Sequence, residues 1–568
     1  MWRFHSDSSV TKTGVWVDNV NVQILPGTVT ISGNVTYTDR YGTAGRSAGY
    51  INIMVWDQNA NGSWDFLEEK SADLNGHFQF DPRENWDDDP GDLDHRLDLY
   101  LVYESVYHKG QSNEHKVTDL NNQSYWWNIQ GQYVRWNVSN GTFSLTDVLP
   151  PEPDSRAKAI WLFEDIVHAY WLVPGDPGPA RIRWEQGTKC TTVLGVQVCS
   201  AIFAPIPSPN GVFIPDELES VNSQDIVVHE TTHEYMANSN GFWYPFGAGI
   251  ESFLQCVVQT HGFFDSKTAA CAYTEGWADF VAIEVNKSFD PNDNCFDWDA
   301  NHCGGFSQNI ETPHRGDGRN EGDTVEGRVA GSLWDLYDTN NESFDRSSVD
   351  WSSIWAIQRA TGTFNFRAFW DTWGAQSQTN AVYNKHNAVQ SLYQNSIDYD
   401  NAPTSSPVSD VVMLQGMTRD NAVDLWSGPF NDQESARSEM TYSVVNTSAN
   451  CGARIDSNHY VDIDLRFYPT FIGICNVTIR ANDGIKTVDN VFRENILRIA
   501  GRNFLPLIIS NLDGSGVDSA ASSISPSAEK EVFPLISAYP APMESNNNDS
   551  EAQSTFNPDN NPYPAPQP

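Results

Sequence analysis

Alternating apolar and polar positions dominate two parts of the chain, one near its start and one near its end. Residues 27–39 and 96–105 are short runs rich in β-branched and aromatic residues, and Gly, Asn and Asp separate such runs. The same alternating pattern occurs again at 475–484. Short strands divided by turn residues are typical of β-sandwiches. We therefore expect one sandwich over residues 25–150 and a second one over 401–500.

Apolar residues at helical spacing replace this alternation in the middle of the chain. Residues 154–173 show the spacing and stop at Pro174, while residues 210–216 have the composition of a strand. Several such helices with a few early strands predict an α+β domain over 151–400. Residues 501–568 begin with one apolar strand and are otherwise rich in Pro, Ser and Asn. We expect this tail to be disordered, because it cannot bury enough apolar surface to fold.

The charge of the chain narrows the range of its partners. Its 568 residues carry 74 acidic and 34 basic side chains, which gives a formal net charge of −40 at pH 7. A surface this negative repels phosphate backbones and anionic lipid headgroups, so we expect no nucleic-acid partner. No run of apolar residues approaches the ~18 that a membrane span needs, so we expect no membrane insertion.

The eight cysteines fall into close sequential couples, at 190 and 199, 256 and 271, 295 and 303, and 451 and 475. We predict that each couple forms a disulfide, although eight cysteines allow about 105 pairings. The alternative is eight buried thiols in a reducing compartment. Disulfides persist in oxidising surroundings. We therefore expect an extracellular, secreted protein whose signal peptide is trimmed or lies upstream of Met1, since the first residues do not resemble one.

Two histidines and two glutamates crowd the stretch VVHETTHEYM at residues 227–236. On a helix, which Asn222 is expected to cap, His229 and His233 lie one turn apart and reach the same zinc ion. Glu230 sits one step round the helix, where it can accept a proton from water without binding the metal. The alternative is a polar helix that matches a short motif by chance.

A zinc ion needs a third protein ligand, and three known arrangements supply one. The first requires a glycine and a histidine after the motif, but Met236 and Ser239 stand at those places. The second requires an aspartate in a Gly-Thr-x-x-Asp context, which does not occur downstream. The third is a glutamate on a later helix followed four residues on by an aspartate, and Glu275 and Asp279 provide it within an apolar run. Two buried carboxylates are costly unless a cation compensates them, although a pair at a solvated helix edge needs none.

His229-Glu-x-x-His233 followed by Glu275-Gly-x-x-Asp279 resembles the gluzincin metallopeptidases, the clan of thermolysin-like and fungalysin-like enzymes. The resemblance covers most of the predicted α+β domain and implies that this domain is zincin-like. It implies that His229, His233 and Glu275 bind Zn²⁺. It also implies that Glu230 is the catalytic general base and that Asp279 orients a ligand imidazole.

The chain departs from thermolysin in two respects. The gap between the two zinc-ligand motifs is about twice as long as in that enzyme, and it contains one of the predicted disulfides. In addition, no residue clearly matches the histidine that stabilises the oxyanion. A helix at 326–338 resembles the one that follows that histidine, but acidic Glu321 and Asp323 precede it. Tyr244 and His314 remain as candidates for the oxyanion stabiliser.

A second metal ion, Ca²⁺, is expected from a loop pattern within the N-terminal sandwich. The pattern places oxygen ligands at Asp57, Asn59, Asn61, Asp65 and Glu68. It follows a strand and not a helix, so a calcium-binding β-loop competes with a plain polar hairpin turn. The acidic loop at 290–299 leaves the same two interpretations open, ion binding or simple solvation.

The complete sequence therefore predicts a multidomain protein. An α+β zincin-like catalytic domain lies between an N-terminal β-sandwich and a C-terminal Ig/cadherin-like β-sandwich, and a disordered C-terminal tail follows. The N-terminal sandwich loosely resembles carboxypeptidase-regulatory-like domains, and the C-terminal one resembles immunoglobulin- or cadherin-like modules.

The functional interpretation is a secreted zinc metalloendopeptidase that cleaves polypeptide substrates. The strand at 210–216 is the expected edge that pairs with an extended peptide. The alternative is a non-catalytic secreted or surface adhesion protein on a zincin scaffold, with cell-surface or matrix contacts through its sandwich modules. The intact Glu230 favours the enzyme, because a purely structural zinc site needs no base.

Overall fold

The computed structural model describes most of the chain up to residue 498. The described residues are 26–88, 95–108, 114–128, 134–151, 156–193, 195–205, 210–240, 255–256, 262–287, 294–299, 303–312, 314–340, 342–361 and 365–498. The chain separates into two units, residues 1–498 and residues 499–568. The predicted apolar strand and disordered tail at 501–568 therefore lie outside the described residues.

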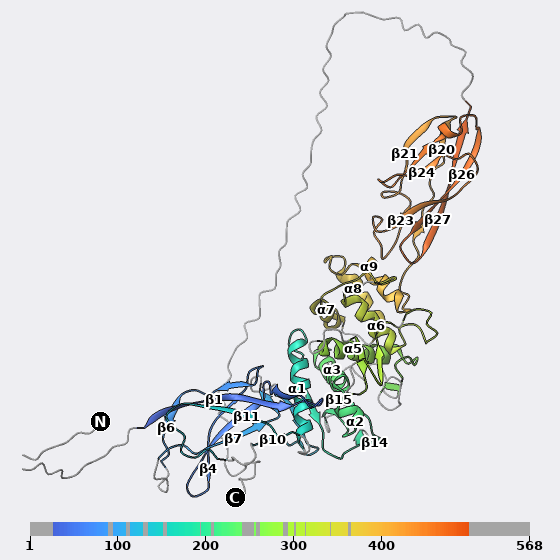
Figure 1. Cartoon of the computed structure of the whole chain (residues 1–568). Helices are drawn as coiled ribbons and strands as arrows, with labels where there is room; N and C mark the ends of the chain where they lie inside the picture. Colours follow the sequence, from blue (N-terminus) through green and yellow to red (C-terminus); the bar gives the residue numbers. More distant parts are fainter. Residues whose placement is uncertain are drawn as a thin grey trace, which may run out of the picture. The chain divides into compact units, whose positions relative to one another are not determined.

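Two β-sheets form the first part of the described chain, which is drawn in blue in Figure 1. The first sheet is centred on β1 (Gly27–Thr38), which pairs in parallel with β11 (Gly141–Val148) and antiparallel with β2 (Ala44–Ser47), β5 (His77–Gln79) and β6 (Arg83–Asn85). The second sheet has the order β10 (Trp126–Trp127), β7 (Leu99–Glu104), β3 (Asn52–Gln58), β4 (Trp64–Ser71). The prediction of a β-rich module at the N-terminus is confirmed.

A third sheet joins strands from both sides of the expected boundary at residue 150. Its order is β15 (Ile202–Pro205), β16 (Asn210–Phe213), β12 (Arg181–Arg183), β9 (Glu114–Thr118), β8 (Val106–His108). The expected edge strand at 210–216 is wrong, because β16 pairs with β12 on one side and with β15 on the other. The edge strand on that side is β15. The hairpin of β13 (Thr191–Val193) and β14 (Val196–Val198) lies between β12 and β15 in the sequence.

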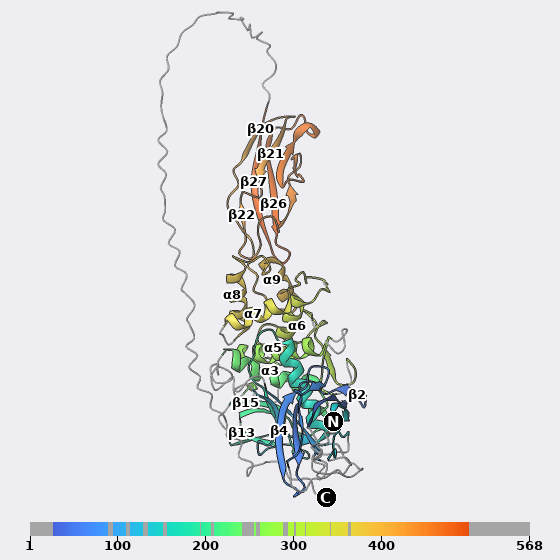
Figure 2. The same cartoon turned by 90° about the vertical axis from the view of Figure 1, so that its left-hand side faces the viewer.

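Helices make up most of the middle of the chain. They are α1 (Ala157–Leu172), α2 (Leu218–Val221), α3 (Gln224–Asn240), α5 (Ala269–Asn286), α6 (Glu326–Tyr337), α7 (Trp351–Thr361), α8 (Phe366–Gln376) and α9 (Lys385–Gln394). A small hairpin of β17 (Cys295–Asp297) and β18 (Ser307–Asn309) lies between α5 and α6. Helices α3 and α5 lie side by side in both views (Figures 1 and 2). None of the described helices is both long and apolar enough to cross a bilayer.

One hydrophobic core continues from the N-terminal sheets into these helices. It includes Val29 of β1, Ile182 of β12, Trp277 of α5 and Leu392 of α9. Helices α5 and α6 approach closely at Gly276, where an added Cβ would lie 2.5 Å from the carbonyl oxygen of Glu326. The helix that carries the predicted third ligand is therefore fixed against α6 by backbone contact.

A separate core lies in the second β-rich part of the chain. One sheet has the order β20 (Val411–Leu414), β27 (Thr487–Leu497), β26 (Gly473–Asn482), β23 (Thr441–Thr447), and the other β21 (Thr418–Asp424), β25 (Tyr460–Asp464), β24 (Ala453–Ile455). The short strands β19 (Thr404–Ser405) and β22 (Phe430–Asn431) pair with each other, and the 3-10 helix η3 (Leu465–Phe467) follows β25. Alternate residues of β26 and β27 are buried, which is the pattern that predicted a β-rich module here.

All four predicted disulfides are present, and no described cysteine is free. The bonds are Cys190–Cys199, Cys256–Cys271, Cys295–Cys303 and Cys451–Cys475. Each closes a short loop, between 8 and 24 residues in sequence separation. The first bond closes the β13–β14 hairpin, and the third closes the loop that follows β17.

Candidate metal centre

Helix α3 carries the two motif histidines on a face that packs into the core. The helix begins after Ser223, whose hydroxyl accepts a hydrogen bond from the backbone N–H of Ile226 at 3.1 Å. Asn222 was the expected cap, so that prediction is wrong by one residue; the Ser223 hydroxyl reaches the first free N–H groups. Val227 and Val228 are completely buried and hold the helix against the core.

Helix α5 presents the two predicted carboxylates toward α3. Thr268 caps the helix by accepting a hydrogen bond from the N–H of Cys271 at 3.2 Å. Glu275 and Asp279 follow one turn apart and are only 4% and 1% exposed. The alternative of a solvated pair at a helix edge is therefore excluded. Buried carboxylates require a positively charged partner or several hydrogen-bond donors.

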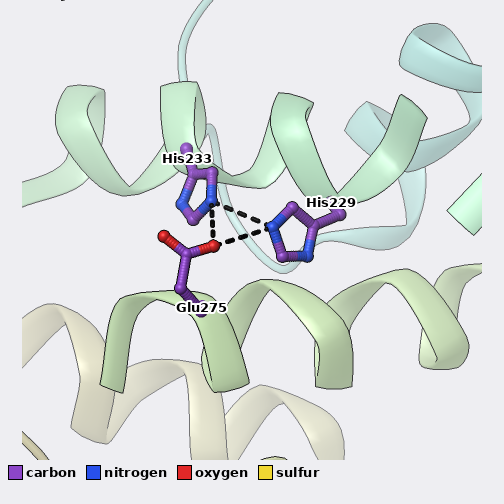
Figure 3. A group of neighbouring side chains, drawn as sticks. All are labelled: His229, His233 and Glu275. Atoms are coloured by element: carbon purple, nitrogen blue, oxygen red, sulfur yellow. Dashed lines mark hydrogen bonds and ion pairs between the residues drawn. The ribbon is translucent and has the colours of Figure 1, made fainter. Parts of the chain in front are cut away.

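The side chains of His229, His233 and Glu275 converge on one point between the helices (Figure 3). His229 Nε2 lies 3.0 Å from Glu275 Oε2, and His233 Nε2 lies 3.2 Å from the same oxygen. The two Nε2 atoms are 3.1 Å apart. Four ligands at the usual distance from zinc, about 2.0–2.1 Å, are about 3.3 Å from one another in a tetrahedron. The three donor atoms already have nearly this spacing, so the residues fit a zinc ion.

The pKa of His229 also indicates that this group of side chains requires a positive charge. Burial lowers the pKa of His229, but hydrogen bonds with Asp279 and Glu275 outweigh burial and raise the pKa well above its usual value. Among the described residues, three sets of potential ligands have donor atoms within 4.8 Å of one another. The other two sets each contain a disulfide pair, whose sulfur atoms are not thiolates. Only this set of described residues offers three unmodified donors.

Asp279 fixes the orientation of the first histidine. Its Oδ1 lies 2.8 Å from His229 Nδ1, on the opposite side of the ring from the convergent Nε2. A proton on Nδ1 that is donated to Asp279 leaves Nε2 with a free lone pair, which is the state that a metal ligand needs. The role that the resemblance implied for Asp279 agrees with this geometry.

The loop closed by Cys295–Cys303 forms a wall of the site. Phe296 contacts the ring of His229 edge-on, with ring centroids 5.6 Å apart. The backbone N–H of Asp297 donates to Asp225 Oδ2 on α3 at 2.8 Å. Asp297 is 3% exposed, and its carboxylate accepts a hydrogen bond from the N–H of Cys303. This part of the acidic loop is structural; Asp290 and Asp293 lie outside the described residues.

Glu230 lies beside this set of donors without belonging to it. Burial is the main cause that raises the pKa of the Glu230 carboxyl, while His229 and His233 lower it. Its carboxylate also accepts a hydrogen bond from the backbone N–H of Phe203, on the edge strand β15. The candidate base therefore joins the histidine helix to β15, which is the edge strand of the third sheet among the described residues. No sequence motif singles out Phe203, and only the short apolar run after Cys199 indicates that strand.

Only one of the two candidates for the oxyanion stabiliser lies within the described residues. Tyr244 lies outside the described residues. His314 lies in an exposed turn, where its carbonyl oxygen accepts a hydrogen bond from Arg328 Nη1 at 3.1 Å. Arg328 also binds the carbonyl oxygen of Asn320 and the carboxylate of Asp317, so it fixes the approach to α6. Among the described residues, no hydrogen bond or ion pair joins His314 to the metal ligands.

The predicted calcium loop folds as a hairpin turn between β3 and β4. Asn61 Oδ1 accepts a hydrogen bond from the N–H of Ser63, and Asn59 Nδ2 donates to Ser63 Oγ. Asp57 is buried and accepts from the N–H of Asp98, whereas Glu68 pairs with Arg83 at 2.7 Å. The remaining residue, Asp65, is the cross-strand neighbour of Asp57. The three carboxylates do not bring ligand atoms within 4.8 Å of one another, so the geometry favours the plain polar turn.

Comparisons with known proteins relate only part of the chain to a family. The family model of the mycolysin C-terminal domain matches residues 207–396, about a third of the chain. This segment includes the three converging side chains, Glu230 and Asp279, and the match indicates a relationship to a peptidase family. A comparison with curated proteins finds no match.

Similar solved structures are distant. The endo-fucoidan hydrolase MfFcnA4 from glycoside hydrolase family 107 is 18% identical over 19% of this chain and 15% of its own, with a TM-score of 0.15. A 9R-lipoxygenase from Cyanothece PCC8801 is 16% identical over 47% of this chain and 25% of its own, with the same TM-score. The chain therefore spans a quarter or less of these proteins, and at such TM-scores the likeness supports no conclusion about fold or function.

Proposed function

We propose that the protein is a zinc metalloendopeptidase in which His229, His233 and Glu275 hold the metal. The observation that carries this proposal is the convergence of their donor atoms to within 3.0–3.2 Å. When bound, zinc supplies Lewis acidity that polarises a peptide carbonyl and acidifies water. The match to the mycolysin C-terminal domain supports the same class of reaction.

Glu230 acts as the general base of the reaction. It is adjacent in sequence to a ligand histidine, and burial raises its pKa from the ordinary value of a glutamate. A carboxylate with a raised pKa is a stronger base, and catalysis is most efficient when this pKa approaches the working pH. Glu230 takes a proton from the attacking water and later delivers it to the departing amine.

Strand β15 binds the substrate in an extended conformation. Among the strands that the structure describes, it pairs with β16 alone, through one of its two edges. The N–H of Phe203 points to Glu230, so the other edge of β15 borders the catalytic groups. A peptide that adds to this edge would place its backbone next to the base, and main-chain pairing tolerates many sequences. This binding mode favours a broad endopeptidase.

The protein acts outside the cell. Four disulfides join all eight cysteines, which is typical of oxidising compartments. The second candidate function is an adhesion protein with a retained zincin scaffold. The observation in its favour is that His314 has no contact with the metal ligands among the described residues.

The decisive experiment measures zinc content and cleavage of unfolded casein by purified wild type and Glu230→Gln. We expect one zinc per chain in both and cleavage by the wild type alone. The matched control is Glu234→Gln on the same helix, since Glu234 accepts a hydrogen bond from the N–H of Arg181 and does not reach the metal ligands. The control should cleave like the wild type. A zinc-loaded wild type that cleaves no peptide in a broad library would support the adhesion protein.

A further inference from the structure

A cavity opens on the surface of the C-terminal β-rich module, in a part of the chain that the proposed reaction does not use. Its volume of about 490 Å³ lies within the range of small-molecule sites, about 300–1,000 Å³. Its walls come from the loop that follows β21 and from the end of β22 with the residues after it. Trp426 and Ala436 are the apolar side chains of the lining, and the others are polar.

Trp426 gives this cavity a flat apolar surface. Its side chain is 45% exposed, although the ring of His459 stacks on one of its faces, with ring centroids 4.3 Å apart and an angle of 26° between the planes. Because one face is covered, the exposed part of the indole includes the other face. His459 does not line the cavity, so the open face of Trp426 is the one available to a ligand there.

Contacts of the loop backbone hold Trp426 in this position. The N–H of Trp426 donates to Asp424 Oδ1 at 2.9 Å, and the N–H of Leu425 donates to the carbonyl oxygen of His459 at 3.1 Å. The loop turns so closely at Gly428 that an added Cβ would collide with the carbonyl oxygen of Asp424. A ligand therefore meets a surface that is already in place, which lowers the entropic cost of binding.

Polar groups with spare hydrogen-bonding capacity line the same cavity. Arg437 donates from Nε to the carbonyl oxygen of Phe430 at 2.7 Å and from Nη1 to that of Trp426 at 3.1 Å. Its Nη2 donates to Asn431 Oδ1 at 2.6 Å. In the described part of the chain these bonds use three of the five N–H groups of the guanidinium, so two remain for a ligand. Because Asn431 Oδ1 is occupied, the amide nitrogen of Asn431 is the group left to bind a ligand.

This mixture of groups fits a neutral sugar better than it fits other ligands. A purely apolar ligand would displace water from Arg437 and Asn431 without replacing the lost hydrogen bonds. An anion would be attracted by Arg437, but it would be repelled by Asp432 in the same wall and by the net charge of −40. A pyranose ring has a flat face of C–H groups, which suits the electron-rich face of an indole. Its hydroxyl groups both donate and accept hydrogen bonds.

We propose that this cavity binds a neutral sugar unit of a polysaccharide. The sugar ring stacks on the open face of Trp426, and its hydroxyl groups accept hydrogen bonds from Arg437 and Asn431 and donate one to Asp432. Two backbone N–H groups hold Asp432 Oδ1 in place, at 2.7 and 2.8 Å. A contact with one sugar unit is weak, with a Kd of about 1 mM. The cavity binds without zinc, so the proposal does not depend on peptidase activity.

The experiment is affinity electrophoresis of the full chain in native gels that contain a polysaccharide. The neutral polymers are hydroxyethylcellulose, galactomannan, arabinoxylan and dextran. Carboxymethylcellulose is the charged control, because it shares the glucan backbone of hydroxyethylcellulose. We expect at least one neutral polymer to retard the wild type relative to a marker protein, and carboxymethylcellulose to retard it less. A wild type that no neutral polymer retards would overturn the proposal, and so would stronger retardation by the charged polymer.

Variants of the lining residues locate the binding site. Trp426→Ala should weaken binding by about 10-fold or more because the stacking surface is lost, and Asn431→Ala by about 3–10-fold. Ala436 is exposed, so Ala436→Gln fills the cavity without removing a packing contact. This variant should abolish retardation and keep the Tm of the wild type, which separates blocked binding from unfolding.

The matched control is Trp171→Ala. Trp171 is 47% exposed and also stacks by one face, on Tyr50 with ring centroids 5.0 Å apart, but it does not line the cavity. Trp171→Ala should be retarded like the wild type. Equal retardation of the wild type, Trp426→Ala and Ala436→Gln would show that sugar binds elsewhere and would refute the proposed site. A wild type that binds a fluorescent proline-rich peptide but no polysaccharide would assign the cavity to a protein partner instead.

Discussion

The metal centre between α3 and α5 and a group of acidic side chains at the end of α6 compensate buried negative charge in different ways. The second group, called here the α6 acid cluster, consists of Glu311, Asp335, Asp338, Glu342 and Asp345. In the metal centre, two imidazoles and one carboxylate hold three donor atoms within 3.0–3.2 Å. In the α6 acid cluster, five carboxylates share a small region without any imidazole, and their donor atoms remain further apart. The metal centre lies on α3 and α5, whereas the acidic side chains lie on α6 and in the segments before and after it.

The difference follows from the charge of the donors. In the metal centre the carboxylates of Asp279 and Glu275 hydrogen-bond to the imidazole of His229 from its two sides, so the site can form before the metal binds. Buried carboxylates that lie close together repel each other, so they favour protonation: burial, followed by repulsion from Glu311, raises the pKa of Asp338 to about 7 and that of Glu342 to about 8. Changes in the α6 acid cluster should therefore leave metal binding intact, whereas changes in the metal centre should not.

The largest expected effect is the loss of zinc from the metal centre. Glu275→Ala and His233→Ala each remove one of three ligands, so bound zinc should fall from about one per chain to below about 0.2. Zinc measured by atomic emission after dialysis checks this. Glu342→Gln, in the α6 acid cluster, should keep its zinc. Full zinc retention by Glu275→Ala would contradict the proposal that Glu275 is a zinc ligand.

The second effect separates metal binding from chemistry within the same site. Glu230→Gln keeps all three ligands and a nearly identical shape, but an amide cannot accept a proton. Cleavage should fall by about 10²–10⁴-fold, toward the upper end because the same carboxylate moves two protons. The measurement is cleavage of a quenched fluorescent peptide by matched, zinc-loaded proteins, with melting curves alongside. Equal cleavage by both proteins would show that the activity comes from a contaminant.

The third effect tests whether the metal centre is organised before binding. Asp279→Asn keeps the size of the side chain but weakens its hold on His229 Nδ1. Zinc affinity should fall by about 10–100-fold. Competition with a chromophoric chelator gives this affinity. The matched control is Glu284→Gln on the same helix, whose carboxylate accepts a hydrogen bond from Tyr337 and does not contact the histidines. An unchanged affinity in Asp279→Asn would mean that the helix alone positions His229.

Sequence patterns predicted the two helices that carry the proposed zinc ligands. The motif at 227–236 and the apolar run around Glu275 each contain their own periodicity, so helices α3 and α5 could be placed and their inward faces identified. The four disulfides were also predictable, because each joins cysteines close in sequence. In these cases the information lies within one short segment.

Properties that depend on distant segments could not be predicted. Strand β9 joins β12, although about 60 residues and the whole of α1 separate them, so the boundary expected at residue 150 runs through a sheet. The edge position of β15 depends on how β16 pairs with its two neighbours, β12 and β15, which are both too short for their order in the sheet to be predicted from sequence. The α6 acid cluster needs Glu311 beside Glu342, a contact that no local pattern contains.

The smallest expected effect concerns a third site, the single buried carboxylate of Glu494, which has neither imidazoles nor other acids around it. Glu494 faces the core of the C-terminal module and is completely buried. Its carboxyl lies within 4.8 Å of the sulfur atoms of Cys451 and Cys475, which are joined and cannot bind a metal. Burial raises the pKa of Glu494 to about 7, although a hydrogen bond from the Gly452 backbone lowers it. A proton therefore compensates the charge of Glu494, as a metal cation would in the metal centre.

Because the pKa of Glu494 is raised, the contribution of this carboxyl to folding stability depends on pH with a known sign. A carboxyl whose pKa is raised by folding binds its proton more tightly in the folded state, so its contribution to stability is full below about pH 4 and is lost as the pH rises through about 7. Glu494→Gln should therefore match the wild type near pH 5 and melt a few degrees higher at pH 8, by about 2–4 °C. Melting curves of the full chain from pH 5 to 8 measure this. The control, Asp420→Asn on exposed β21, should follow the wild type. If Glu494→Gln and the wild type keep the same difference in Tm at every pH, then Glu494 is ionised throughout and the core must supply it with donors or a cation.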